Sequence, residues 1–163
     1  MNYHIIDLSK DYVVKVVKLF IDSIRIHFKN ILCDEELYMW TYEGTEKEFY
    51  ENLETNNLYI RVITNDDGDV LGFTRFGDDY ETPGIGWIDL IFVDDAYHNK
   101  GFGKYLLHDA FAKLSQDGFD QVHLWTPTFG KAHGFYLKMN GKKANKKINK
   151  IGFDLTEYVW ELN

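Results

Sequence analysis

Hydrophobic residues recur at intervals of three and four positions in several stretches of the chain, the spacing that places them on one face of a helix. The first stretch covers about residues 10–28, with Ser9 as its expected N-cap. A second helical region begins near Asp34, and Thr-Glu-Lys-Glu from Thr45 is a capping box that predicts a helix restarting there. Two further helices are predicted, at about 102–117 and about 129–140.

Runs of apolar and β-branched residues between these helices predict strands. A polar turn at 65–69 separates two of them and is typical of a β-hairpin. The expected strands are 59–63, 70–76, 87–93, 122–125, 144–150 and 154–162, the last two joined by a turn at Gly152. The order helix, helix, hairpin, strand, helix, strand, helix, strand, strand predicts one α/β domain over residues 1–163, a mixed sheet flanked by helices.

Composition narrows the possible classes of function. The chain has 163 residues, a net charge of −8 and a single cysteine, Cys33, which excludes an internal disulfide. Charged residues near the start and the lack of a long apolar run predict a cytoplasmic protein with no signal peptide and no membrane span. The acidic balance disfavours nucleic acid as a partner. The sequence leaves open whether the protein is a monomer or a homodimer.

Charge is divided unevenly along the chain. Residues 1–99 carry 8 Lys/Arg and 20 Asp/Glu, whereas residues 100–163 carry 10 and 6. One interpretation is that the C-terminal part handles an anionic cofactor while the N-terminal part attracts a cation. The other is a chance gradient on an ordinary surface. Histidine and acidic residues show no metal-ligand spacing, so no metal is predicted.

A glycine-rich turn in the second half of the chain is the most informative segment for function. Gly101 and Gly103 permit close approach to the backbone, and the helix that opens there presents unpaired N–H groups and the positive end of its dipole. Lys100 and Lys104 add positive charge, so a phosphate-bearing ligand is expected near residues 98–104. The spacing fits neither a Walker A loop, since no Ser or Thr follows the lysine, nor a Rossmann fingerprint, since the third glycine is missing.

This turn resembles motif A of the GNAT superfamily of N-acetyltransferases, Val-x-Pro-x-x-(Arg/Gln)-x-x-Gly-x-(Gly/Ala). Val93, Gly101 and Gly103 match the motif without gaps. Asp95 stands where proline is usual, and His98 stands where arginine or glutamine is usual.

Residues 132–141 are similar to a second motif of the same family, Ala-x-x-Phe-Tyr-x-x-x-Gly. Asn140 occupies the usual glycine position, and asparagine also tolerates the left-handed conformation. Phe129 stands where the family commonly has Asn. The resemblance covers essentially the whole chain and implies the GNAT architecture, in which the strands equivalent to 88–93 and 121–125 splay apart.

The resemblance implies acetyl-CoA as co-substrate. In the family, the pantetheine arm lies in the wedge between the splayed strands, which implies that main-chain groups of Ile91 and Val93, on either side of Phe92, pair with its amides. The other expected cofactor contacts come from the glycine-rich turn and from the second motif: His98, Asn99, Lys100, Gly101, Phe102, Gly103, Lys104 and Lys131.

The resemblance casts Tyr136 as the general acid, because a positioned phenol can protonate the departing thiolate. The alternative is that Tyr136 is simply a residue of an apolar helix face. Asp89 is the candidate base on a strand leading to the cofactor, and the rival interpretation is a solvent-facing Asp. Tyr80 and Glu81 are further candidates, and some family members use no dedicated base.

Four aromatic residues are candidates for lining the acceptor site, although aromatic residues dominate cores as well as clefts and the pattern favours the core for each of them: Phe28, Tyr38, Trp40 and Trp125. The function expected from the resemblance is direct acetyl transfer, in a ternary complex, to a small amine, a polyamine or a peptide amine. One alternative is a CoA- or acyl-CoA-binding module without turnover. Another is an unrelated α/β domain with accidental motifs.

Overall fold

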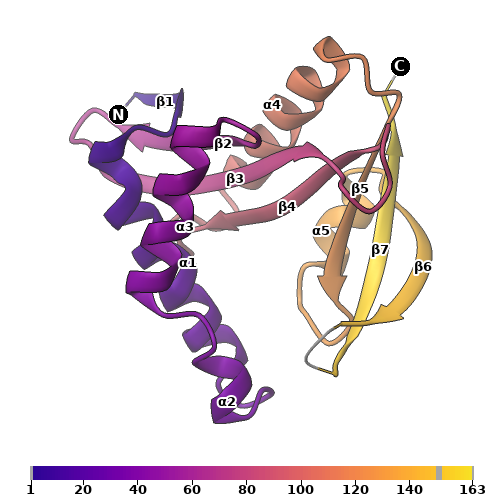
Figure 1. Ribbon diagram of the computed structural model, residues 1–163, viewed down its shortest axis with the longest axis horizontal. Coiled ribbons are helices and arrows are strands. Elements are labelled where there is room, and N and C mark those ends of the chain that lie inside the picture. The colour runs from indigo at the N-terminus through magenta and orange to yellow at the C-terminus, as the bar shows by residue number, and fades with distance from the viewer. Residues whose placement is uncertain (1, 150–151, 163) are drawn as a thin grey trace. The chain divides into compact units, whose positions relative to one another are not determined.

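The computed structural model describes residues 2–149 and 152–162. Its helices are η1 (Lys10–Tyr12), α1 (Val13–Phe28), α2 (Asp34–Leu37), α3 (Tyr42–Thr55), η2 (Asp95–Tyr97), α4 (Phe102–Gln116) and α5 (His133–Lys138). Its strands are β1 (Tyr3–Asp7), β2 (Tyr59–Asn65), β3 (Val70–Asp78), β4 (Gly86–Val93), β5 (Gln121–Pro127), β6 (Lys142–Ile148) and β7 (Asp154–Glu161). The strands of the described residues form a seven-stranded sheet in the order β1-β2-β3-β4-β5-β7-β6 (Figure 1).

Strand direction confirms the predicted mixed sheet. β4 and β5 are parallel, as expected for strands joined through a helix, and their register aligns Gly86–Ile88 with Val122–Leu124. β1 pairs with β2, and β7 pairs with both β5 and β6, in antiparallel fashion.

Contacts within the chain define two compact units. Unit 1 comprises Met1–Arg75 and Leu90–Leu107, and unit 2 comprises Phe76–Asp89 and His108–Asn163. Strands β3 and β4 and helix α4 each contribute residues to both units. The expectation of a single domain over residues 1–163 stays a prediction.

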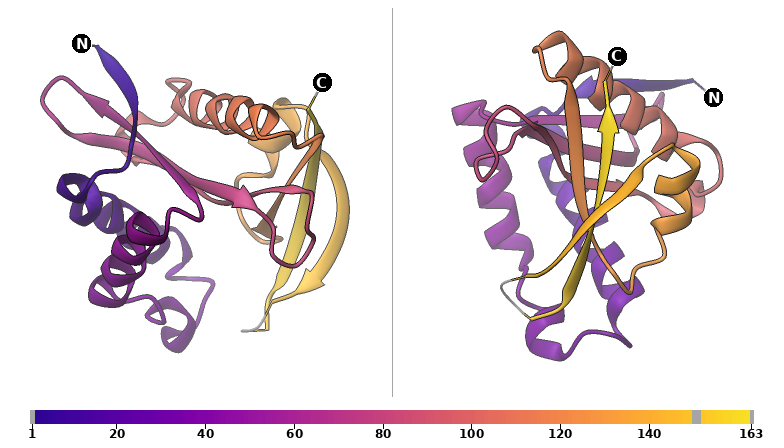
Figure 2. Two further views of the ribbon diagram at one scale, coloured as in Figure 1. Left: turned by 45° about the horizontal axis from the view of Figure 1, so that its top comes forward. Right: turned by 90° about the vertical axis from the view of Figure 1, so that its right-hand side faces the viewer.

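The core of unit 1 begins with the amphipathic face of α1. That face buries seven residues: Val13, Val16, Val17, Phe20, Ile21, Ser23 and Ile24. Helices α1 and α3 lie side by side (Figure 2), and each sends a phenylalanine onto the Phe73 ring of β3. The ring centroids of Phe20 and Phe49 lie 6.3 and 6.0 Å from that of Phe73, both edge to face.

A second cluster in unit 1 forms around the first turns of α4. Phe102 and Leu106 pack with Ile63 of β2 and Leu71 of β3. Half-buried side chains from β1, β4 and η2 complete it: Ile5, Ile91, Val93 and Tyr97. The start of α4 is therefore fixed by hydrophobic contact directly beside the glycine-rich turn.

Unit 2 is organised around β5 and β7. Val122 and Leu124 of β5 are fully or almost fully buried, as are Tyr158 and Trp160 of β7. β7 lies between β5 and β6 (Figure 1), whereas every residue of β6 is exposed. Four of the seven β6 residues are lysines, a composition typical of an edge strand protected against further pairing.

Two expectations about the N-terminal half were wrong. Strand β1 was not predicted, because five residues with only two adjacent half-buried apolar side chains give no alternation. Helix α3 begins at Tyr42 rather than at Thr45. Thr41 is its N-cap, since the Thr41 hydroxyl accepts a hydrogen bond from the Gly44 N–H at 3.1 Å, and Thr45 is buried inside the helix.

The helix expected at 129–140 is shorter than predicted. The Gly130 N–H bonds to the Pro127 carbonyl at 2.9 Å, which closes a turn, and α5 begins only at His133. Its end confirms the expectation for Asn140, which has φ 64° in the left-handed region.

The backbone of β4 lies close to Gly72 of β3, and a substitution at Gly72 tests this packing directly. A Cβ atom built there would lie 2.8 Å from the Phe92 carbonyl oxygen and 3.3 Å from the Val93 Cα atom. We expect Gly72→Ala to lower the free energy of unfolding by roughly 1–3 kcal/mol, measured by urea denaturation. Gly134→Ala is the matched control, because a Cβ at this helical position meets no atom within 4 Å in the part of the chain that the structure describes. Equal stability of Gly72→Ala and the native protein would contradict the packing described.

Candidate functional site

The glycine-rich turn of unit 1 adopts a left-handed backbone at two positions. Asn99 has φ 60° and Gly101 has φ 88°. A Cβ on Gly101 would meet no atom of the described residues within 4 Å, so glycine is needed there for its conformation rather than for space. The Tyr105 N–H bonds to the Gly101 carbonyl at 3.0 Å as the first helical bond of α4. The preceding N–H groups of the turn have no intrahelical acceptor, which is the arrangement that binds anions.

The expected cofactor residues around this turn lie close together in unit 1. Asn99, Lys100 and Lys104 are exposed, and the Lys100 ammonium lies 4.8 Å from the centroid of the Tyr97 ring. Phe102 is buried in the cluster around α4, so only its main chain is available to a ligand. Lys131, the expected contact from the second motif, is exposed in unit 2.

The strand residues expected to pair with pantetheine differ in their side-chain environment. Ile91 and Val93 pack on the α4 cluster. The Phe92 ring stacks on Phe73 at 5.9 Å and meets Phe20 edge to face at 5.1 Å. All three side chains pack in the core of unit 1, so at these three positions the main chain is the part that can bind a ligand.

The His98 side chain is engaged in contacts within the protein itself. Its Nε2 donates to the Val93 carbonyl oxygen at 2.8 Å, so the proton is on Nε2 and Nδ1 is the nitrogen left for another partner. Asp95 lies between two imidazoles, with its Oδ1 atom 2.8 Å from His27 Nε2 and 3.5 Å from His98 Nε2. The rings of His27 and His98 stack at 6.3 Å. Sequence reasoning missed this arrangement, because His27 and Asp95 are far apart in the chain.

Tyr136 lies on α5 in unit 2 and is 5% exposed. Its ring centroid is 5.2 Å from Tyr158 and 6.1 Å from Trp160. Burial, with a smaller effect of Tyr158, raises the pKa of the Tyr136 hydroxyl well above its ordinary value, and a hydrogen bond with the Thr126 side chain opposes the shift. The hydroxyl therefore keeps its proton throughout the physiological range.

A second phenol in the same cluster was not singled out from the sequence. His133 Nε2 lies 3.0 Å from the Thr128 carbonyl oxygen, which can only accept, so Nε2 carries the hydrogen. The neutral imidazole then accepts at Nδ1 from the Tyr158 hydroxyl at 2.8 Å. Burial also raises the pKa of Tyr158.

The other candidate residues are distributed over both units. Asp89 is half-buried on β4 within unit 2, and Tyr80 and Glu81 are exposed. In unit 1, Phe28 is half-buried and Trp40 meets Phe20 edge to face at 6.2 Å. The exposed Tyr38 ring has the Arg25 guanidinium 4.9 Å from its centroid.

Trp125 and Phe129, both in unit 2, have well-defined partners. Trp125 is half-buried and lies under the Lys147 ammonium, 4.3 Å from the ring centroid. Phe129, at the position where asparagine is common, packs edge to face on Phe153 at 5.3 Å.

Unit 2 also buries a charged cluster that the sequence did not reveal. His123 Nδ1 lies 2.8 Å from Glu157 Oε1, and its Nε2 lies 3.0 Å from Asp79 Oδ2 in an ion pair without hydrogen-bond geometry. The side chains of His123, Asp79 and Glu157 are 7%, 10% and 10% exposed. Asn145 Nδ2 donates to Glu157 Oε2 at 2.6 Å, and the Glu81 N–H donates to Asp79 Oδ1 at 3.0 Å. No set of described residues has the geometry of a metal site.

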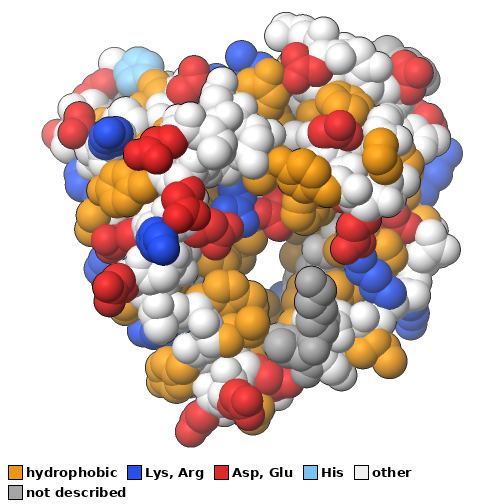
Figure 3. All heavy atoms as spheres, viewed as in Figure 1, with side chains coloured by type: hydrophobic (Ala, Val, Ile, Leu, Met, Phe, Trp, Pro, Cys, Tyr) orange, Lys and Arg blue, Asp and Glu red, His pale blue; other side chains and the backbone are white. Residues whose placement is uncertain are grey.

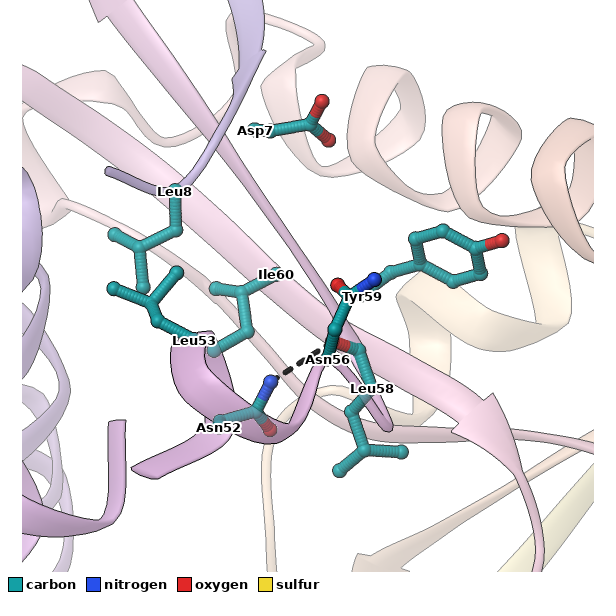
Figure 4. A pocket seen from close by; sticks show the side chains of 8 residues that line it. All are labelled: Asp7, Leu8, Asn52, Leu53, Asn56, Leu58, Tyr59 and Ile60. Carbon is teal, nitrogen blue, oxygen red and sulfur yellow. Dashed lines mark hydrogen bonds between the residues drawn. The ribbon is translucent and has the colours of Figure 1, made fainter. Parts of the chain in front are cut away.

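A small pocket in unit 1 is lined by eight residues, namely Asp7, Leu8, Asn52, Leu53, Asn56, Leu58, Tyr59 and Ile60 (Figure 4). Its volume is about 60 Å³. Asn52 Nδ2 donates to the Leu58 carbonyl at 2.8 Å at its edge. The pocket has room for water but not for a coenzyme.

Comparison with known proteins identifies the family. The sequence matches the Acetyltransferase (GNAT) family over residues 26–141, so the chain belongs to it. Enzymes of this family transfer an acyl group from acetyl-CoA, their co-substrate. The match confirms the resemblance found in the two motifs. No curated protein matches the sequence.

Similar solved structures share the fold over nearly the whole chain. An N-acetyltransferase from Staphylococcus aureus Mu50 is 22% identical with a TM-score of 0.78, covering 100% of each chain. PaiA N-acetyltransferase from Thermoplasma acidophilum, in complex with coenzyme A, is 15% identical with a TM-score of 0.76, covering 98% of this chain and 100% of that one. YncA from Salmonella typhimurium, with its cofactor acetyl-CoA, is 16% identical with a TM-score of 0.74, covering 99% of this chain and 94% of that one.

None of the helices in the described residues combines the length and the hydropathy that crossing a membrane requires.

The raised pKa of Tyr136 predicts a loss of stability at high pH. The unfolded chain releases the phenolic proton at the ordinary pKa of 10.0, before the folded protein does, so alkaline pH favours unfolding. Below pH 10 the contribution of Tyr136 is constant. Above it, the free energy of unfolding falls by up to about 1.4 kcal/mol per pH unit from this group. Urea denaturation between pH 8 and pH 11 should show a shallower decline in Tyr136→Phe, and identical slopes would contradict the assignment.

The buried charged cluster generates a second stability prediction. Glu157→Gln removes one carboxylate from an almost completely buried cluster in which Glu157 contacts His123, and we expect the free energy of unfolding to fall by on the order of 3 kcal/mol. Glu161→Gln is the control on the same strand. Glu161 is exposed, and its Oε1 atom accepts a hydrogen bond from Gln121 Nε2 at 2.8 Å. Thermal and urea unfolding measure both variants. A Glu157→Gln protein as stable as the control would mean that the cluster contributes nothing to folding.

Proposed function

We propose that this protein transfers an acetyl group from acetyl-CoA to a primary amine, directly and within a ternary complex. The observation that carries the proposal is the family match over residues 26–141, a range that includes both the glycine-rich turn and α5. The turn offers the main-chain donors that a diphosphate requires, and α5 carries a protonated phenol.

Residues of unit 1 would hold the coenzyme. The left-handed backbone at Asn99 and Gly101 leads into the start of α4, whose first N–H groups lack intrahelical acceptors, and Lys100 and Lys104 supply exposed positive charge beside it. The main chain of Ile91 and Val93 would pair with the pantetheine amides. His98 would contribute through Nδ1, because its Nε2 is held by the Val93 carbonyl.

Tyr136 is the proposed acid. Bound acetyl-CoA supplies a thioester whose carbonyl is attacked by the amine and whose thiolate then departs. Because its pKa is raised, the Tyr136 hydroxyl stays protonated and can donate a hydrogen bond. It also gives up its proton less readily than a free phenol does. We therefore assign it stabilisation of the charge that develops on sulfur, with proton transfer completing the departure.

An amine acceptor must be neutral when it attacks, so a proton has to leave it. Asp89 remains the candidate base, as a half-buried carboxylate on β4. The acidic balance of the first 99 residues favours a cationic acceptor. Helix α3 alone carries five glutamates, and Figure 3 shows acidic side chains spread over this part of the protein.

A CoA-binding module without turnover is the second candidate function. The aromatic packing of Tyr136 and the phenylalanine at position 129 favour it, since both side chains serve the core of unit 2. Thermal stabilisation by CoA is expected under both proposals. Release of free thiol from acetyl-CoA with a panel of amines is expected only for the enzyme, and its absence throughout the panel would leave the binding module.

The role of Tyr136 has a matched control in its neighbour. We expect Tyr136→Phe to lower kcat by about 100-fold with little change in the Kd for CoA. Tyr158→Phe removes a hydroxyl from the same aromatic cluster but one already engaged by His133, so a much smaller loss is expected. Steady-state thiol release and calorimetric titration with CoA measure the two effects. Equal losses in both variants would reduce Tyr136 to a packing residue.

A further inference from the structure

One face of unit 2 gathers aromatic and charged side chains around Trp125. On β5, Trp125 and His123 share this face, because they are two positions apart. The register places Glu157 of β7 directly opposite Trp125, and it pairs Lys147 of β6 with Leu155, two residues before Glu157. We call this surface the Trp125 face. The loop between β3 and β4 adds Asp79 and Glu81 to it through their contacts with His123 and Lys147.

A primary ammonium group already occupies the Trp125 face. The Lys147 Nζ atom lies 4.3 Å from the centroid of the Trp125 ring and 3.5 Å from Glu81 Oε2. An aromatic face combined with a carboxylate is the chemical environment that recognises an alkylammonium ion. The Lys147 side chain therefore marks what kind of group this surface accepts.

The charges behind the ring favour a cation. His123 faces one carboxylate oxygen at each ring nitrogen, from Asp79 and from Glu157. Even with a hydrogen on both nitrogens, the imidazole balances only one of these two carboxylates. Glu81 adds a further negative charge, and Lys147 offsets it. Without the Lys147 ammonium, the face would carry excess negative charge beside the half-buried Trp125 ring.

The contacts of Lys147 are of the kind that a ligand displaces easily. Its side chain is 41% exposed and that of Glu81 is 77% exposed, and exposed ion pairs are weak. Lys147 also lies on the edge strand β6, where every residue is exposed. Its flexible side chain can swing into solvent without disturbing buried packing.

We propose that the Trp125 face binds an ammonium group of the acceptor, and that Lys147 occupies this subsite until the acceptor displaces it. The inference rests on the proposed acetyl transfer and narrows its substrate class to amines with a second cationic centre. One amine is acetylated while the other, still protonated, is held between the Trp125 ring and Glu81.

Diamines and monoamines of equal chain length test the proposal. We expect the KM for 1,4-diaminobutane to be about tenfold lower than that for 1-aminobutane. Trp125→Leu and Glu81→Gln should each reduce this preference, and Lys147→Met should enhance it by removing the internal competitor. Lys146→Met is the control, because it removes a lysine from the same exposed strand at a position opposite Thr156, which lies on the other face of the sheet from Glu157. It should leave both KM values unchanged.

Binding measured without acetyl-CoA separates this proposal from the proposed enzymatic activity. Nuclear magnetic resonance titration with 1,4-diaminobutane should shift the Trp125 indole signal, with tighter binding in Lys147→Met and loss of binding in Trp125→Leu. Circular dichroism checks that Trp125→Leu is folded, and Glu81→Gln tests the subsite at an exposed side chain. Equal KM values for the two amines in the native enzyme would overturn the proposal. So would a preference that survives both Trp125→Leu and Glu81→Gln. If no amine releases thiol, the enzymatic proposal fails, and an unshifted indole signal then overturns the subsite as well.

Discussion

The left-handed backbone at Asn99 and Gly101 is the constraint on which the candidate site depends. It turns the chain after β4 so that α4 can begin at Phe102, where the first N–H groups of a helix have no intrahelical acceptor. Phe102 and Leu106 then bury against Ile63 and Leu71, which fixes the helix start in place. An anion site made of main-chain donors needs this rigidity, because its affinity comes from donors that are already oriented.

Unit 2 buries several polar and charged side chains. One ring nitrogen of His133 donates to backbone carbonyls, and the other accepts a hydrogen bond from the Tyr158 hydroxyl. His123 lies between two carboxylates. Such groups are costly to bury unless they are paired. Their pairing ties β5 and β7 to the loop after β3, and it also leaves negative charge behind Trp125, where an ammonium group sits. Stability and the proposed acceptor preference thus share the same residues.

Most of the fold followed from local pattern. The helices at α1 and α4, the hairpin around residues 65–69 and the paired strands at the C-terminal end were all predicted, because periodicity and turn residues act over short distances. Strand β1 has no alternation of its own and exists only because β2 pairs with it from Tyr3 to Asp7. Thr45 looked like a cap but is buried by tertiary packing, and Thr41 caps the helix instead.

The family, the glycine-rich turn and the phenol of α5 could be identified from the amino-acid sequence, because these depend on spacing within one segment. The folded structure was needed to show which distant side chains meet. It placed His123 between Asp79 and Glu157, and it set Lys147 over Trp125. No local pattern encodes such contacts, since they arise where strands far apart in the chain come together in one sheet.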